Sequence, residues 1–156
     1  MLENLETPDI FALGAVVLAI IILIYFSWKT LITSNAFQKG VELYQKKDYQ
    51  GAEAALRKVI SLNSTNDVVR LLLGDILKEK GQTEEATALY QEVISSSPKN
   101  PDAYLRLANV LMAENQLDTA KDYLQQAQSL LQKQRQPQRA AQVNDLLEKI
   151  TAKSGS

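Results

Sequence analysis

The chain contains neither cysteine nor histidine among its 156 residues. Their absence excludes disulfide bonds, catalytic thiolates, imidazole general bases and zinc sites built from these two residue types. Glycine and proline are scarce, at six and four residues, and aromatic side chains make up only 6% of the chain. Few helix breakers, in a sequence rich in alanine, leucine, glutamine, glutamate and lysine, predict an all-α fold.

No strong charge of either sign is present. The 17 lysines and arginines are balanced by 18 aspartates and glutamates, so the formal net charge is −1. Nucleic-acid-binding domains are usually clearly basic, so we expect no nucleic acid as a partner. Phosphate-loop, nucleophile and metal-ligand motifs are also missing, and the adjacent Glu84 and Glu85 suit a helix start better than acid–base catalysis. We expect a protein that is not an enzyme, with no cofactor and no bound metal.

One long hydrophobic run interrupts this balanced composition. The 19 residues from Ile10 to Trp28 include no charged side chain, and twelve of them are isoleucine, leucine, valine or phenylalanine. As a helix, this run would be about 28 Å long, close to the thickness of the hydrocarbon core of a bilayer. The pattern predicts a transmembrane helix over residues 10–32, preceded by a short acidic N-terminus over residues 1–9.

A cleaved signal peptide and a buried core helix are the other interpretations of this run. A signal peptide begins with basic residues and ends on small ones, whereas this segment begins with acids and ends on bulky residues, from Tyr25 to Trp28. A core helix of a small domain is rarely apolar on every face over such a length. Both comparisons favour a permanent span.

The charges on either side of the run predict its orientation. Every basic residue follows the run, beginning with Lys29, and only acids precede it. By the positive-inside rule, the body lies in the cytoplasm or stroma and the N-terminus lies outside or in the lumen. Tyr25 and Trp28 suit the aromatic belt at the membrane surface. Ala15 and Ala19 form a small-residue pair on which another helix could pack.

The remainder of the chain repeats with a period of 34 residues. Two series of small residues and one series of bulky residues follow this spacing: Gly40, Gly74 and Ala108; Ala52, Ala86 and Ala120; Leu56, Tyr90 and Leu124. Small residues let two helices approach closely, and bulky residues fill the space beside them. The pattern predicts antiparallel helix pairs in three repeats, over residues 33–66, 67–100 and 101–134.

Turn and capping signals support these helix pairs. Gly81 and Asn115 suit the left-handed position that follows a helix, and Asn100 with Pro101 forms a helix start signal. After the third repeat, apolar residues continue at helical spacing: Val143, Leu146, Leu147 and Ile150. We expect residues 137–152 to form a helix that caps the open end of the stack, followed by a tail over residues 153–156.

These features resemble the tetratricopeptide repeat (TPR) family, whose signature is a 34-residue period with small-residue positions and a closing proline. The second repeat matches best, at Leu73, Gly74, Ala86, Tyr90 and Pro98. The first and third repeats lack the closing proline, and the first also has alanine where a large residue is usual. The resemblance implies an N-terminal transmembrane helix followed by a three-repeat α-solenoid with a C-terminal capping helix.

The resemblance also implies a concave groove, lined by the first helix of each repeat, that binds a segment of a partner protein. Eleven residues would line it: Phe37, Val41, Tyr44, Val68, Leu71, Asp75, Lys78, Leu105, Arg106, Asn109 and Met112. Packing between repeats is the other interpretation of each. One TPR subgroup grips acidic chaperone tails with a clamp of lysine, asparagine and arginine. Because only Arg106 agrees with that clamp here, we expect no chaperone-tail binding.

In architecture and size the chain is similar to small membrane-anchored TPR proteins of cyanobacteria and plastids that assist photosystem I assembly. The resemblance implies a thylakoid location and contacts with subunits of photosystem I. We predict a membrane-tethered interaction scaffold that acts as an assembly factor for a membrane complex. The alternatives are a permanent structural subunit of such a complex and, with the topology reversed, a periplasm-facing TPR chaperone. Self-association of the chain also remains open.

Overall fold

The computed structural model describes residues 7–62 and 65–154 of the chain, and within them every regular element is a helix. The seven helices are α1 (Thr7–Gln45), α2 (Tyr49–Leu62), α3 (Asp67–Glu79), α4 (Thr83–Ser96), α5 (Pro101–Ala113), α6 (Leu117–Lys133) and α7 (Pro137–Ser154). Residues 1–6 of the predicted acidic N-terminus and 155–156 of the predicted tail lie outside the described residues.

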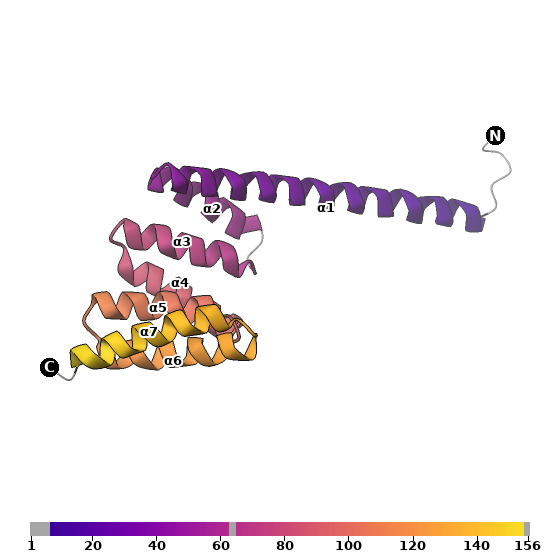
Figure 1. Cartoon of the computed structure of the whole chain (residues 1–156). Helices are drawn as coiled ribbons and strands as arrows, with labels where there is room; N and C mark the ends of the chain where they lie inside the picture. Colours follow the sequence, from indigo (N-terminus) through magenta and orange to yellow (C-terminus); the bar gives the residue numbers. More distant parts are fainter. Residues whose placement is uncertain (1–6, 63–64, 155–156) are drawn as a thin grey trace.

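The helices form a stack in which each one packs against the next along the chain. Figure 1 shows α2 to α6 following one another from top to bottom, α7 in front of α5 and α6, and α1 on top with its N-terminal part projecting far beyond the body. The helices α3 and α5 begin 34 residues apart, at Asp67 and Pro101. The prediction of an all-helical solenoid is confirmed.

Helix α1 differs from the sequence expectation. We expected a membrane helix to end at residue 32 and the first repeat to begin at residue 33, but one helix of 39 residues runs through this point. No proline or glycine lies between Trp28 and Phe37 to break it. The hydroxyls of Thr30 and Thr33 donate to carbonyls four residues earlier, at 2.9 and 2.8 Å. The predicted span and the first repeat therefore share one rod.

Left-handed residues close the helical hairpins. Gly81 and Asn115 adopt φ values of 80° and 60°, as the sequence predicted. Lys47 and Arg135 adopt the same conformation, at 60° and 57°, which was not expected because neither is a glycine or an asparagine. At Gly81 the turn is closed by hydrogen bonds from the amides of Gly81 and Gln82 to carbonyls at the end of α3, those of Lys78 and Leu77.

Asparagine side chains cap two of the helices. The Asn100 side chain accepts a 3.1 Å hydrogen bond from the amide of Asp102, and Pro101 occupies the first turn of α5, as expected. Asn66 caps α3 in the same way by accepting from the amide of Val69 at 3.2 Å. Each cap satisfies one of the free amides at a helix start.

The core is formed by the predicted pairs of small and bulky residues. Tyr90 and Leu56 have no exposed surface, and Leu124 retains 1%. Tyr90 lies against the backbone of α3 at Gly74, because a Cβ at that position would be 2.9 Å from its Cζ atom. The inner face of α7 completes a second core cluster with Leu124 and Leu131 of α6, through these residues: Ala140, Val143 and Ile150.

Ion pairs join the second helix of one repeat to the next repeat. Glu53 on α2 accepts from Lys80 Nζ at 2.5 Å and from Arg57 Nε at 2.8 Å. Arg57 also contacts Glu85 on α4, at 2.5 Å. The hydrogen bond from Lys80, followed by that from Arg57, holds the pKa of Glu53 below its usual value, although partial burial opposes the shift. Glu53 is thus a charged link between α2 and α3.

Replacing Gly74 with alanine should destabilise the body by about 1–2 kcal/mol, since overpacking against Tyr90 outweighs the gain in helix propensity. The midpoint of thermal unfolding, followed by circular dichroism of the full chain in detergent, should fall by several degrees. Gly14→Ala is the matched control, because a Cβ there meets nothing within 4 Å. The loss in a Gly74→Ala/Tyr90→Leu double variant should be smaller than the sum of the single losses, and simple additivity would contradict the close packing.

Stability should depend on pH through Glu53. A carboxyl whose pKa is lowered in the folded state stabilises the fold above its unfolded pKa, and this contribution is lost as the pH falls through the folded pKa. Glu53→Gln should therefore cost about 1 kcal/mol near neutral pH and less as the solution becomes strongly acidic. Thermal unfolding as a function of pH measures this effect. Glu84→Gln removes an exposed carboxylate that is in no ion pair among the described residues, and an equal loss in this control would contradict the assignment.

Candidate partner-binding groove

A hollow of about 340 Å³ lies where α1, α3 and α5 face one side of the stack. Its lining contains six of the eleven residues expected from the sequence, together with Glu79: Tyr44, Asp75, Lys78, Leu105, Arg106 and Asn109. They come from three successive first helices, because the 34-residue period places equivalent positions in adjacent layers. This set, with Glu79, is called the groove below.

Asp75 lies at the centre of a hydrogen-bond network in the groove. Its carboxylate accepts a 2.8 Å hydrogen bond from the Tyr90 hydroxyl on α4. Both of its oxygens lie 2.9 Å from Nε of Arg106 on α5. The side chains of Arg106 and Asp75 retain only 33% and 21% exposure. One carboxylate thus joins α3, α4 and α5 and fixes the spacing of two repeats at the groove.

The two tyrosines beside Asp75 remain protonated donors. Burial, followed by the negative charge of Asp75, raises the pKa of Tyr90 far above its usual value. Burial also raises the pKa of Tyr44, and the nearby Asp75 and Glu79 add to this shift. Both hydroxyls are therefore neutral at physiological pH, and neither phenol supplies a base.

The charges of the groove are mixed. Arg106 is the one residue that agrees with the chaperone-tail clamp, and its guanidinium is already engaged by Asp75. Lys78 adds a cation and Glu79 an anion at the end of α3. Neutral donors and acceptors and one apolar side chain complete the lining. This arrangement suits a polar or mixed segment of polypeptide better than a strongly acidic tail.

The other expected groove residues are placed differently. Val68 is 62% exposed on α3 but does not line the hollow. Val41 is half-buried, Phe37 packs against the main core cluster and Met112 packs against the second. Leu71 corrects the prediction: it is only 4% exposed and is part of the core.

The sequence analysis missed two contributors to the groove. Glu79 lines the hollow beside Lys78. It is the next residue after Lys78 and the last residue of α3, and this position next to an expected groove residue could have identified it. Tyr90 is fully buried and does not line the hollow, but its hydroxyl supports the groove from behind by donating to Asp75. The periodicity assigned Tyr90 to packing alone, and no sequence pattern shows which acceptor a buried hydroxyl reaches.

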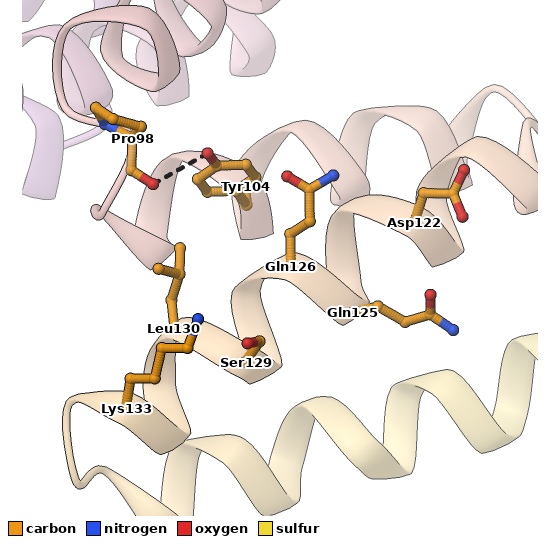
Figure 2. Close-up of a pocket in the computed structure, with 8 residues that line it drawn as sticks. All are labelled: Pro98, Tyr104, Asp122, Gln125, Gln126, Ser129, Leu130 and Lys133. Atoms are coloured by element: carbon orange, nitrogen blue, oxygen red, sulfur yellow. Dashed lines mark hydrogen bonds between the residues drawn. The ribbon is translucent and has the colours of Figure 1, made fainter.

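A second hollow, of about 530 Å³, lies over α6 and contains none of the expected residues. Figure 2 shows Gln125, Gln126 and Ser129 along α6, with Pro98 and Tyr104 at one end, where the Tyr104 hydroxyl donates to the Pro98 carbonyl at 3.0 Å. This lining mixes polar side chains with Pro98 and Leu130, and its residues form no shared network comparable to that around Asp75. The groove is therefore the more specific of these two surfaces.

The predicted membrane segment is uncovered by the body. From Phe11 onward, α1 is long and apolar enough to cross a membrane, and its most apolar stretch is not buried at all. Trp28, at the expected membrane surface, is 67% exposed. The side chain of Ile10, at the other end of the predicted span, lies outside those described. The core-helix interpretation of this stretch is therefore wrong, whereas a span and a signal sequence share its features.

Comparisons with known proteins relate the chain to others of similar architecture. An uncharacterized lipoprotein of Treponema pallidum (strain Nichols) is 30% identical over 86 residues, which are 55% of this chain and 44% of that protein. The matched part thus spans less than half the length of that relative.

Two solved structures illustrate the likeness in fold. The type III secretion chaperone SycD of Yersinia enterocolitica, in complex with a peptide of the translocator YopD, is 23% identical with a TM-score of 0.70, over 78% of this chain and 93% of that one. The TPR2B domain of yeast Sti1, in complex with pHsp70, is 20% identical with a TM-score of 0.72, over 79% and 98%. At these identities the likeness establishes the fold alone.

A family model described as "Tetratricopeptide repeat" matches residues 43–93 and 77–150, which together are more than half of the chain. The match includes all helices from α2 to α6 and most of α7. This agrees with the 34-residue spacing of the helices and with their close packing at small residues. The chain belongs to the tetratricopeptide repeat family.

Proposed function

We propose that the chain is a membrane-tethered scaffold that binds segments of partner proteins in its groove. The observation that carries this proposal is the hollow on α1, α3 and α5, in which contacts within the protein hold Asp75 between Tyr90 and Arg106. A preorganised polar site costs little ordering when it binds. The complexes of SycD with a YopD peptide and of Sti1 with pHsp70 support binding of polypeptide by this fold.

The groove favours an occupant with both charged and neutral polar groups. Lys78 and Glu79 place one charge of each sign in its lining, and Asn109 offers an amide that is exposed to solvent. Asp75 and Arg106 neutralise each other by forming an ion pair, so neither needs an opposite charge from the ligand. Since none of these groups is arranged for a chemical step, the proposal is for binding without catalysis.

Membrane tethering is supported by the exposed apolar length of α1. A soluble body held at a membrane searches in two dimensions, so even a weak groove becomes effective for partners in that membrane. The excess of basic residues after the span favours a body on the cytoplasmic or stromal side. The description of the Treponema relative as a lipoprotein supports membrane attachment of a related body.

For the partner, we propose subunits of a membrane complex that is being assembled. The architectural resemblance to the TPR proteins of photosystem I assembly supports incomplete photosystem I, and hence a thylakoid location, as the candidate to test first. An assembly factor should be found with incomplete complexes and be absent from mature ones. A permanent subunit would remain at constant stoichiometry in the mature complex.

A photoreactive amino acid at Asn109 should capture the partner in intact membranes, because this side chain is exposed at the groove. The same amino acid at Gln125, exposed on α6, is the control and should capture none of these products. Mass spectrometry of the products should find membrane-complex subunits. Equal capture at the two positions would argue against the groove.

Truncating Lys78 should weaken this capture without unfolding the protein. Lys78→Ala removes a long side chain from the groove and should lower the yield of cross-links at Asn109 about fivefold, a typical loss for an interface residue. Lys121→Ala on α6 is the matched control. Both variants should unfold at the same temperature as the parent, and an unchanged yield in Lys78→Ala would remove Lys78 from the binding surface.

The orientation is tested with a single cysteine, since the chain has none of its own. Gln116→Cys lies in the exposed turn between α5 and α6. In sealed vesicles, a membrane-impermeant maleimide should label it only from the cytoplasmic or stromal side. Labelling only from the opposite side would establish the reversed topology and favour the periplasm-facing chaperone. Recovery of a soluble chain without its first thirty or so residues would favour the signal peptide.

A further inference from the structure

The loops at one end of the stack lie beside the point where α1 leaves the body. They join α2 to α3, α4 to α5 and α6 to α7, and with the adjoining helix ends they cover residues 65–67, 95–102 and 132–139. Figure 1 shows these ends on the side toward which α1 projects. We call this edge the proximal rim. The turns at the opposite end, over residues 45–49, 79–85 and 113–119, form the distal rim.

Side-chain contacts connect the proximal rim from α1 to α7. Asn66 shares a hollow of about 450 Å³ with Phe26 and Lys29 of α1. The next links along the rim join three pairs of side chains or backbone groups: Asp67 with Ser96 at 3.5 Å, the Lys99 carbonyl with the Gln134 amide at 2.7 Å, and Asp102 with Arg139. The rim is thus one continuous edge that begins at the end of the apolar part of α1.

The two rims carry opposite charge. The proximal rim contains four basic and two acidic residues, and both acids are paired within the protein, Asp67 with Arg70 and Asp102 with Arg139. Three of its cations are exposed and take part in no ion pair among the described residues: Lys99, Lys133 and Arg135. The distal rim contains three basic and six acidic residues. The body therefore has a basic end next to the span and an acidic end away from it.

We propose that the proximal rim docks onto the anionic headgroups of the membrane that α1 crosses. This inference rests on the proposed span. Because α1 continues into the body as one helix, no linker separates the span from the rim, and Phe26 of the apolar stretch lies level with Asn66 of the first rim loop. Exposed serine and glutamine side chains around Lys99 and Lys133 can donate hydrogen bonds to phosphate oxygens.

The expected size of the effect follows from membrane electrostatics. A lysine or arginine close to an anionic surface gains enough free energy that three such cations favour the docked body on the order of 100-fold over a neutral surface. The attraction decays over a Debye length and is lost at about 1 M salt, where that length is about 3 Å. A body held this way would keep the groove at a constant orientation to the membrane.

The experiment uses two kinds of fluorescent probe: the single tryptophan, and a label on an introduced cysteine, which is unique because the chain has none of its own. The full chain is placed in nanodiscs of phosphatidylcholine alone, or of phosphatidylcholine and phosphatidylglycerol in equal parts. The fluorescence of Trp28, the single tryptophan, reports the span through quenching by lipids brominated on their acyl chains. A fluorophore on Gln138→Cys reports the proximal rim, and one on Gln116→Cys the distal rim, through quenching by lipids spin-labelled at the headgroup.

Quenching of the Gln138→Cys label should rise strongly in the anionic nanodiscs and return to the neutral level at about 1 M salt. The label on Gln116→Cys should respond to neither condition. Substituting glutamate for the three proximal cations should abolish the rise: Lys99→Glu, Lys133→Glu and Arg135→Glu. Substituting three cations outside the proximal rim should leave it unchanged: Lys46→Glu and Lys47→Glu in the distal rim, and Lys149→Glu on α7. Circular dichroism of both triple variants should match the parent.

Two different failures can be told apart. If bromolipids quench Trp28 but the Gln138→Cys label behaves alike in both lipid mixtures, or the two triple variants behave alike, the span stands and the docking is overturned. If bromolipids do not quench Trp28, α1 is not in the bilayer, and the span and the docking fall together.

Discussion

The body depends on one close approach between helices. The absence of a side chain at Gly74 lets the Tyr90 ring lie directly on the backbone of α3, and the ring is fully buried there. In this position the buried Tyr90 hydroxyl donates to Asp75, which in turn binds Arg106 of the next repeat. Packing inside one repeat thereby sets the electrostatics of the groove and its spacing to the following layer. A larger residue at Gly74 would therefore disturb the packing inside the repeat, the electrostatics of the groove and the spacing to the next layer.

The architecture could be predicted from the sequence because the physical determinants of a helical hairpin are local and periodic. Small residues every 34 positions allow close helix contacts. An asparagine followed by a proline, as at Asn100 and Pro101, is a local start signal for a helix. Helix starts and the turns at Gly81 and Asn115 could therefore be predicted. The left-handed conformation of Lys47 could not, because a lysine takes it only when the surrounding hydrogen bonds and packing impose it.

The groove was predicted less well, since its lining depends on how successive layers rotate. Phe37, Leu71 and Leu105 are equivalent in the repeat, yet Leu105 lines the hollow while Leu71 is buried in the core. Leu71 is part of the main core cluster, whereas Leu105 lies beside the second cluster and stays partly exposed, so equivalent positions differ in exposure. The pairing of Arg106 with Asp75 was also beyond the sequence, because it joins residues 31 positions apart in adjacent layers.

The unbroken α1 limits which partners the groove can reach. Tyr44 follows Trp28 by 16 residues on the same helix, so the groove lies about 24 Å from the membrane surface under the proposed orientation. A flexible linker would allow a range of heights, whereas a helix docked at its base allows one. An extended chain covers this distance in about seven residues. The groove is therefore suited to loops and termini that leave the bilayer and rise only a short way, as in subunits not yet covered by their neighbours, and soluble partners gain nothing from this fixed height.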